Sequence, residues 1–241
     1  MFKNLTLICG LALAASLTYS SAQADPQARA AAEGKTTYLV FYRNWDATAQ
    51  AVGQAVKSHA EKHAAKAAWV PVGITDPAQK ALVDKFQVGR APMPLVLGVH
   101  PNGAITGVFQ KPMTEAEFVQ TLVSPAKAEC MKGLQANRLV LLCVQTSAQQ
   151  PVPQGVKDFQ ADPQFAQRTQ VATVQLNDPN EASFFAHLQI DPQANAPVTV
   201  FMAPPGVLVG RFPPTASKAE LSQALHKAGK CCDDKNCKHN H

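Results

Sequence analysis

Charge is scarce in this sequence. Asp, Glu, Lys and Arg make up 16% of its 241 residues, whereas an average soluble domain has about 25%. The net charge is only +5, and Lys and Arg are not gathered in one segment. Because nucleic-acid binding relies on clustered basic side chains, we expect no nucleic acid as partner. The hydrophobic fraction of 46% argues against a disordered chain.

Long apolar runs are also missing after the first residues. Residues 5–17 form one apolar stretch behind Lys3, and Ala22-Gln23-Ala24 is a small-x-small cleavage site. These three parts predict a secretory signal peptide over 1–24. The alternative is a membrane anchor, but a spanning helix needs about 20 apolar residues. We therefore expect a periplasmic or secreted protein that is soluble, with no membrane span after signal cleavage.

The sequence contains two copies of one segment of about a hundred residues. The segment 38–42 aligns with 140–144 at a separation of 102 residues, and Asp76-Pro77 aligns with Asp178-Pro179 at the same separation. One inserted residue then changes the separation to 103, at which Pro94 meets Pro197 and Phe109 meets Phe212. A single insertion over about a hundred residues indicates a tandem duplication of one domain.

Each copy has the same predicted series of elements. A short helix (26–33; 126–134) precedes a buried strand (37–42; 139–144), and a helix follows that is clearer in the first copy (47–66). A second strand (68–74; 171–176) leads to a helix begun by Asp-Pro (77–86; 179–188). Two strands joined by a turn (95–99 and 104–109; 198–202 and 207–212) and a Thr- or Ser-capped helix close the copy. This order predicts an α/β fold with a mixed central sheet and helices on both faces.

Each copy resembles a thioredoxin-like domain. The residues that carry the resemblance are Ala91-Pro92-Met93-Pro94, followed by Gly103, and Ala196-Pro197, followed by Gly206. They match the cis-proline strand and the β-hairpin of that family, which implies cis bonds before Pro94 and Pro197. The predicted organisation is a thioredoxin-like domain 1 over 25–125, a thioredoxin-like domain 2 over 126–228 and a C-terminal tail over 229–241.

The family's Cys-x-x-Cys motif is absent from both expected positions. Asn44-Trp45 is similar to the start of that motif, but Asp46-Ala47-Thr48-Ala49 follows, and the second copy has Ala148-Gln149-Gln150-Pro151 in that place. Without a thiol, neither position can perform dithiol exchange, so no catalytic residue is assigned. Tandem copies of this kind resemble the non-catalytic modules of exported folding factors, which bind other proteins.

Cys130 and Cys143 occur only in the second copy. Export into an oxidising compartment favours a disulfide between them, and the loop that it closes would stabilise the fold by about 3 kcal/mol in the chain-entropy model. The alternative is two separate buried thiols, since free cysteine is often buried.

The tail concentrates metal-binding side chains. Its candidate ligands for Zn(II) or Cu(I) are Cys231, Cys232, Cys237, His239 and His241. Thiolate and imidazole groups suit these ions, although neighbouring Cys231 and Cys232 are awkward as ligands of one ion. A local disulfide or a tail without a role are the alternatives. No organic cofactor is expected, because no phosphate-binding loop is present.

His59 and His63 share one face of the predicted helix 47–66, but Glu61 between them does not complete a zinc-protease motif. We expect them on a solvated helix edge, without a ligand role.

Three functional hypotheses follow. The first is an exported, redox-inactive binding or scaffold protein with a metal-binding tail, whose partner is another exported protein. The second is a thiol-disulfide exchange enzyme that uses the tail cysteines or Cys130 and Cys143. The third is a purely structural envelope protein without a small ligand. The missing Cys-x-x-Cys favours a non-enzymatic role.

Overall fold

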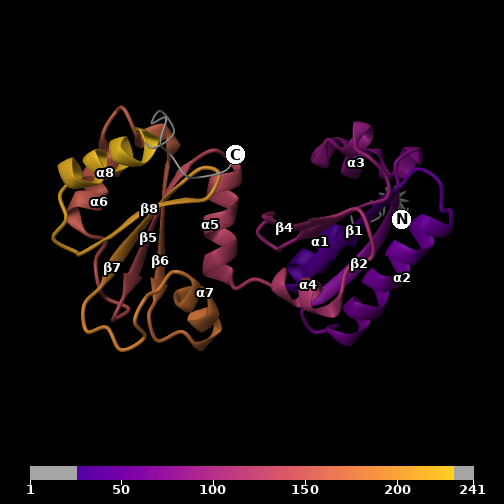
Figure 1. The fold of residues 1–241 in the computed structure, drawn as a ribbon, viewed down its shortest axis with the longest axis horizontal. Helices are drawn as coiled ribbons and strands as arrows, with labels where there is room; N and C mark the ends of the chain where they lie inside the picture. The colour runs from indigo at the N-terminus through magenta and orange to yellow at the C-terminus, as the bar shows by residue number, and fades with distance from the viewer. Residues whose placement is uncertain (1–25, 231–241) are drawn as a thin grey trace, which may run out of the picture.

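A computed structural model describes residues 26–230 of the chain, which form two α/β domains in tandem (Figure 1). The strands of the first domain are β1 (Thr36–Tyr42), β2 (Ala67–Gly73), β3 (Leu95–Val99) and β4 (Ile105–Phe109). Those of the second are β5 (Leu139–Gln145), β6 (Thr169–Gln175), β7 (Val198–Ala203) and β8 (Val207–Phe212). The sheets have the orders β2-β1-β3-β4 and β6-β5-β7-β8.

Both sheets are mixed. The first two strands of each sheet pair in parallel, and the remaining pairs are antiparallel. A parallel pair needs a crossover helix, and a helix fills this place in each domain. The predicted fold class is therefore confirmed: the chain has two tandem thioredoxin-like domains, each with a mixed central sheet and helices on both faces.

The helices alternate between the two faces of each sheet. In domain 1 they are α1 (Pro26–Ala32), α2 (Ala47–Lys62), α3 (Lys80–Phe86) and α4 (Glu115–Gln120), and in domain 2 they are α5 (Pro125–Gln135), α6 (Gln154–Ala161), α7 (Ala182–His187) and α8 (Lys218–Lys230). Short 3₁₀ turns are η1 (Pro77–Gln79), η2 (Val88–Arg90), η3 (Ala166–Arg168) and η4 (Pro179–Glu181). The predicted caps of the closing helices are present: Glu117 N–H donates to the Thr114 hydroxyl, and Glu220 N–H donates to the Ser217 hydroxyl.

Each sheet separates two apolar cores because its central strand is buried on both faces. In β1, Tyr38 and Val40 face α2 and α4, whereas Leu39 and Phe41 face the core that includes α3. Strand β5 repeats this division. Side chains of β5 alternate between a core with α5 and α7 and a core with α6 and α8. This alternation explains why both strands are almost uninterrupted apolar runs.

The alignment of the first strands is corrected by the structure. Tyr38 pairs with Gly98 and Leu141 pairs with Phe201, so the separation between β1 and β5 is 103 residues and not 102. The predicted alignment of Tyr38 with Val140 is one residue out of register. A slip of one residue in a strand moves a side chain to the opposite face of the sheet. Both strands are continuous apolar runs, so the sequence pattern could not reveal the slip.

The predicted disulfide between Cys130 and Cys143 is wrong. Both cysteines are free thiols and both are buried. Cys130 lies on α5 and belongs to the core on that face, whereas Cys143 points into the core beneath α6 and α8. The sheet itself separates them. The alternative of two separate buried thiols describes the second domain correctly.

One of the two predicted cis bonds is present. The Met93–Pro94 bond is cis, but the Ala196–Pro197 bond is not, and the cis bond of domain 2 is Pro204–Pro205. Because trans is the preferred form of most X–Pro bonds, a shared proline position does not dictate the isomer. The prediction for Pro197 is therefore corrected.

The short segment 121–124 connects α4 of domain 1 to α5, the first helix of domain 2, and both ends of α5 make hydrogen bonds that involve this junction (Figure 1). At its start, the buried carboxylate of Glu181 accepts hydrogen bonds from the Ser124 hydroxyl and from Ala126 N–H, the latter at 2.8 Å. At its end, the Gln135 carboxamide accepts from Ile105 N–H at 2.9 Å and donates to the Ile105 carbonyl at 2.6 Å. The second domain thus covers part of the edge of β4.

Two predicted segments fall outside the described residues: the signal peptide over 1–24 and the metal-binding side chains of the tail. Within 26–230, none of the helices combines the length and the hydropathy needed to cross a membrane.

Candidate functional site

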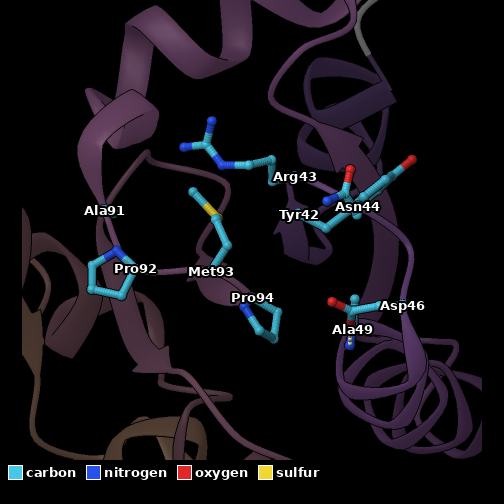
Figure 2. A pocket seen from close by; sticks show the side chains of 9 residues that line it. All are labelled: Tyr42, Arg43, Asn44, Asp46, Ala49, Ala91, Pro92, Met93 and Pro94. Atoms are coloured by element: carbon cyan, nitrogen blue, oxygen red, sulfur yellow. Dashed lines mark hydrogen bonds between the residues drawn. The ribbon is translucent and has the colours of Figure 1, made fainter.

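A groove lies in domain 1 between the end of β1 and the loop that precedes β3. Its volume is about 350 Å³, and Figure 2 shows the side chains that surround it. The lining residues are Tyr42, Arg43, Asn44, Asp46, Ala49, Ala91, Pro92, Met93 and Pro94. Two segments separated by more than 40 positions in the sequence therefore meet at this one place.

One wall of the groove is the start of α2. Asp46 is the N-cap of this helix, and its Oδ1 accepts a hydrogen bond from Ala49 N–H at 2.9 Å. The first N–H groups of a helix lack partners within the helix and favour a negative charge. In thioredoxin-like oxidoreductases, which this domain resembles, the first cysteine of the Cys-x-x-Cys motif occupies the position of Asp46. Here a carboxylate caps the helix end, which would otherwise stabilise a thiolate.

The opposite wall is the loop that ends in the cis bond. The turn η2 leads into this loop, and Pro94 is buried directly before β3 begins at Leu95. Met93 is half-buried and contacts the core on the α3 face. Its thioether is nevertheless part of the groove lining, and Figure 2 shows the Arg43 guanidinium on the same side of the groove as Met93.

The chemistry of the lining favours binding. It offers a guanidinium donor, a carboxamide, a phenol, a carboxylate and a polarizable thioether. None of the nine lining residues is a cysteine, histidine or lysine, and the carboxylate of Asp46 is engaged as a helix cap. A nucleophile with a base beside it, which covalent catalysis requires, is not formed by these nine residues.

The corresponding place in domain 2 is occupied by glutamine side chains. Gln145, at the end of β5, donates from its carboxamide to the carbonyl of Gln150 and accepts from Gln175 Nε2 at 2.9 Å. The Gln150 side chain in turn accepts from Thr146 N–H at 2.9 Å. The segment 148–151, which aligns with the missing motif, is thereby tied to the end of its own sheet.

The sequence indicated Pro94 and the substituted motif, but it assigned no role in a groove to Arg43 or to Met93. Only their positions in the sequence could have indicated that these two residues line the groove. Met93 precedes the predicted cis proline, and Arg43 follows the last residue of β1. A side chain at either junction lies close to the groove in this topology.

His59 of α2 and His63, the C-cap residue of that helix, do not lie on a solvated edge as expected. Both are half-buried against the ring of Phe118, at centroid distances of 5.5 Å for His59 and 5.7 Å for His63. His59 Nε2 lies 3.1 Å from the carbonyl oxygen of Met113, and His63 Nε2 lies 3.5 Å from Glu115 Oε1. Helix α4 covers this face of α2, which the helical period alone could not show.

The two cysteines of domain 2 have no activating environment. Burial raises the pKa of Cys130 to about 12, and the neighbouring carboxylates of Glu129 and Glu181 act in the same direction. Burial also raises the pKa of Cys143. Within residues 26–230, no three His, Cys, Asp or Glu side chains gather closely enough to hold a metal ion.

No protein-family model matches this chain, and no curated protein matches it. Among solved structures, it is similar to a thioredoxin from Thermus thermophilus, with 22% identity over 49% of this chain and 96% of that one, at a TM-score of 0.32. The zinc-bound form of human ERp44 is 8% identical over 83% of this chain, which spans 57% of that protein, at a TM-score of 0.34. The NTD_N/C domain of the alkylhydroperoxide reductase AhpF from Enterococcus faecalis is 16% identical over 83% of this chain and 96% of that one, at a TM-score of 0.30.

Proposed function

We propose that this protein is an exported, redox-inactive tandem thioredoxin-like binding or scaffold protein. Its domain 1 groove would hold an extended segment of another exported protein. One observation carries the proposal: the groove between α2 and the Met93–Pro94 loop is open, while the position of the family's thiol pair is taken by the helix-capping carboxylate of Asp46.

The groove suits a polypeptide better than a small metabolite. Met93 supplies an adaptable apolar contact of the kind found at surfaces that accept varied partners. Arg43 is exposed and can donate to carbonyl or carboxylate oxygens along a backbone.

The test uses a permanently unfolded protein as the probe. Fluorescein-labelled, reduced and carboxymethylated lactalbumin should raise its anisotropy on addition of the full chain. Arg43→Glu and Met93→Asp should weaken this binding at least about tenfold, as expected for residues at the centre of an interface. Arg138→Glu, the same charge reversal at an exposed arginine of domain 2, is the matched control. Equal affinity of the unchanged protein and the three variants would show that the groove does not bind the unfolded protein.

Thiol-disulfide exchange remains the alternative function, and the structure restricts which cysteines could perform it. Cys130 and Cys143 are buried on opposite faces of the sheet, so an exchange reaction would have to use the tail cysteines. Insulin reduction separates the two functions. Turnover that disappears in the Cys231→Ser, Cys232→Ser protein would establish the enzyme and overturn the binding proposal.

The tail is proposed to bind Zn(II) or Cu(I) through thiolates and imidazoles. The reduced protein should take up about one equivalent of either ion, and uptake should weaken at acidic pH because thiolate ligands must lose protons. Truncation after Gly229 should abolish binding, and alanine at His239 and His241 should weaken it. Alanine at His59 and His63 is the matched control. A truncated protein that keeps its metal would place the site elsewhere.

Export is proposed from the N-terminal signal. N-terminal sequencing of protein recovered from the periplasm or the medium should begin at Asp25. A mature chain that begins at Met1 would contradict the proposal.

A further inference from the structure

A second concavity of domain 1, separate from the groove described above, is lined by residues of α2 and by Trp69 of β2. Its volume is about 400 Å³. The lining residues are Trp45, Gln50, Ala51, Gly53, Gln54 and Trp69. Two indole rings and two carboxamides therefore surround a floor of small residues, and no lining residue carries a charge. We call this concavity the tryptophan cleft.

Trp45 is held in place although it is exposed. Its indole lies so close to Gly53 that a Cβ at this glycine would be 2.5 Å from Trp45 Cη2. Its ring meets the ring of Tyr42 edge-on at a centroid distance of 4.6 Å, and its carbonyl accepts from Gln50 Nε2 at 2.9 Å. The side chain still exposes 39% of its surface. A large aromatic group that is positioned by several contacts and left open to solvent is typical of binding surfaces.

Trp69 forms the second wall. It lies on β2, which is an edge strand, and it packs partly against the core beneath α2. Gln50 and Gln54 are one helical turn apart, so they share a face of α2, and both line the cleft. Gln54 is exposed, and its carboxamide has both donor and acceptor groups for a ligand.

This combination fits one kind of polypeptide. A polyproline II helix has no internal hydrogen bonds, so its carbonyl groups are free to accept from a carboxamide or an indole N–H. Its proline rings are uncharged and rigid, and they pack between aromatic side chains in grooves of this type at little cost in conformational entropy. A charged peptide would gain nothing from a lining without charge.

We propose that the tryptophan cleft binds a proline-rich segment of a partner protein in the polyproline II conformation. The proposal does not depend on the groove at Pro94, because the two sites have no lining residue in common. The partner would contact domain 1 with its proline rings between Trp45 and Trp69, and its carbonyl groups would accept hydrogen bonds from the carboxamide of Gln54.

The chain provides its own reporter for the test. It contains only two tryptophans, and both line the cleft, so tryptophan fluorescence of the full chain measures events at this site. Titration with acetylated octaproline amide should give a saturable change in emission. Trp45→Ala, read through Trp69, should bind at least about tenfold more weakly, as expected for a central aromatic residue. Gly53→Ala should weaken binding as well, because the added Cβ displaces the Trp45 ring.

The controls keep the proposal testable if an aromatic variant fails to fold. Gln54→Glu changes an exposed side chain and should weaken binding by placing a charge in the neutral cleft. Gln160→Glu, the same change on the exposed face of α6 in domain 2, should have no effect. Arg43→Glu should bind octaproline normally, which separates this site from the groove at Pro94.

Three outcomes would overturn the proposal. The first is no saturable change with octaproline up to about 1 mM, the weak end of specific affinities. The second is unchanged affinity in the folded Gly53→Ala and Gln54→Glu proteins. The third is saturable binding of cellohexaose but not of octaproline, which would assign the cleft to neutral saccharides instead.

Discussion

At the end of β1, domain 1 has an open groove beside Pro94, whereas at the end of β5, domain 2 has a closed set of hydrogen bonds among Gln145, Gln150 and Gln175. The strands behind these two places pair in the same order and in the same directions. The duplicated domains therefore keep the same buried strands and differ in the loops that follow them. This comparison shows that the scaffold and the site are specified by different residues.

A second difference concerns the edges of the two sheets. In domain 1, Ile105 of β4 has its backbone N–H and carbonyl bonded by Gln135 of the following domain. In domain 2, the equivalent Leu208 of β8 is 42% exposed, and within residues 26–230 no group from outside its sheet bonds to its backbone. Among the described residues, the outer edge of β4 therefore has a hydrogen-bonding partner in domain 2, whereas the equivalent position of β8 has none.

The largest effect is expected in the cores that the domains share. Phe118 of α4 and Leu221 of α8 are equivalent and fully buried, and Phe118 also stacks on Tyr38 at 4.2 Å. Phe118→Ala should cost about 3–5 kcal/mol and Leu221→Ala about 2–5 kcal/mol in the free energy of unfolding. Urea denaturation measures both. As a control, Val119→Ala at the exposed neighbouring position should change the free energy of unfolding by no more than about 0.5 kcal/mol. A change as small as this for Phe118→Ala would contradict the described packing.

The second prediction concerns the thiols that only domain 2 contains. Because burial raises the pKa of Cys130 to about 12, its thiolate population at a given pH should be about a thousandfold below that of an ordinary thiol, equivalent to about 4 kcal/mol. Alkylation of the native protein should be slower to that extent than alkylation in urea. The measurement needs protein of residues 25–241 with Cys231→Ser, Cys232→Ser, Cys237→Ser and Cys143→Ala, which leaves Cys130 as its one cysteine. Equal rates in both states would show that Cys130 is accessible.

The same shift has a consequence for stability. The folded pKa lies above the unfolded one, so the stabilisation is complete below the unfolded pKa of about 9 and is lost as the pH rises toward 12. The free energy of unfolding of domain 2 should therefore fall as the pH rises from about 9 to about 12. Cys130→Ala protein should show less of this alkaline loss.

The third prediction tests how each domain uses one equivalent position. Glu181 binds the start of α5, whereas its counterpart Gln79 accepts from Gly73 N–H within its own domain at 2.7 Å. Glu181→Ala leaves two donors without their acceptor and should cost about 1–3 kcal/mol. Gln79→Ala removes one neutral bond and should cost about 1 kcal/mol. Thermal unfolding of both variants measures the two costs. A larger loss of stability for Gln79→Ala than for Glu181→Ala would show that the bonds of Glu181 to the start of α5 are not the more important ones.

The smallest effect is expected at the covered edge. Gln135→Ala removes two hydrogen bonds at the surface and should cost about 1 kcal/mol or less. Its clearer result is local, because the amide of Ile105 should exchange its hydrogen faster and approach the rate of Leu208. Hydrogen exchange followed by NMR measures both amides. If the Ile105 rate did not change, the carboxamide would not protect the edge.

The fold was predictable because its signals are local and were repeated. Apolar strands, Asp-Pro helix starts and capped closing helices occur in both copies, and each independent occurrence supports the other. The groove was partly predictable for the same reason, since Pro94 and the segment after Trp45 mark its two walls. The closing glutamine network of domain 2 was not predictable, because Gln145, Gln150 and Gln175 follow no spacing that a motif requires.

The sequence by itself determined the tandem α/β architecture and the lack of a thiol pair at both expected positions, because element order and residue identity are written along the chain. Only the tertiary structure decided which face each strand residue occupies. A shift of one residue placed Cys143 across the sheet from Cys130 and excluded their disulfide. In the same way, only the packing of α4 on α2 brought Phe118 against His59 and His63. Continuous apolar strands carry no alternation, so their orientation is fixed by the helices that pack on them.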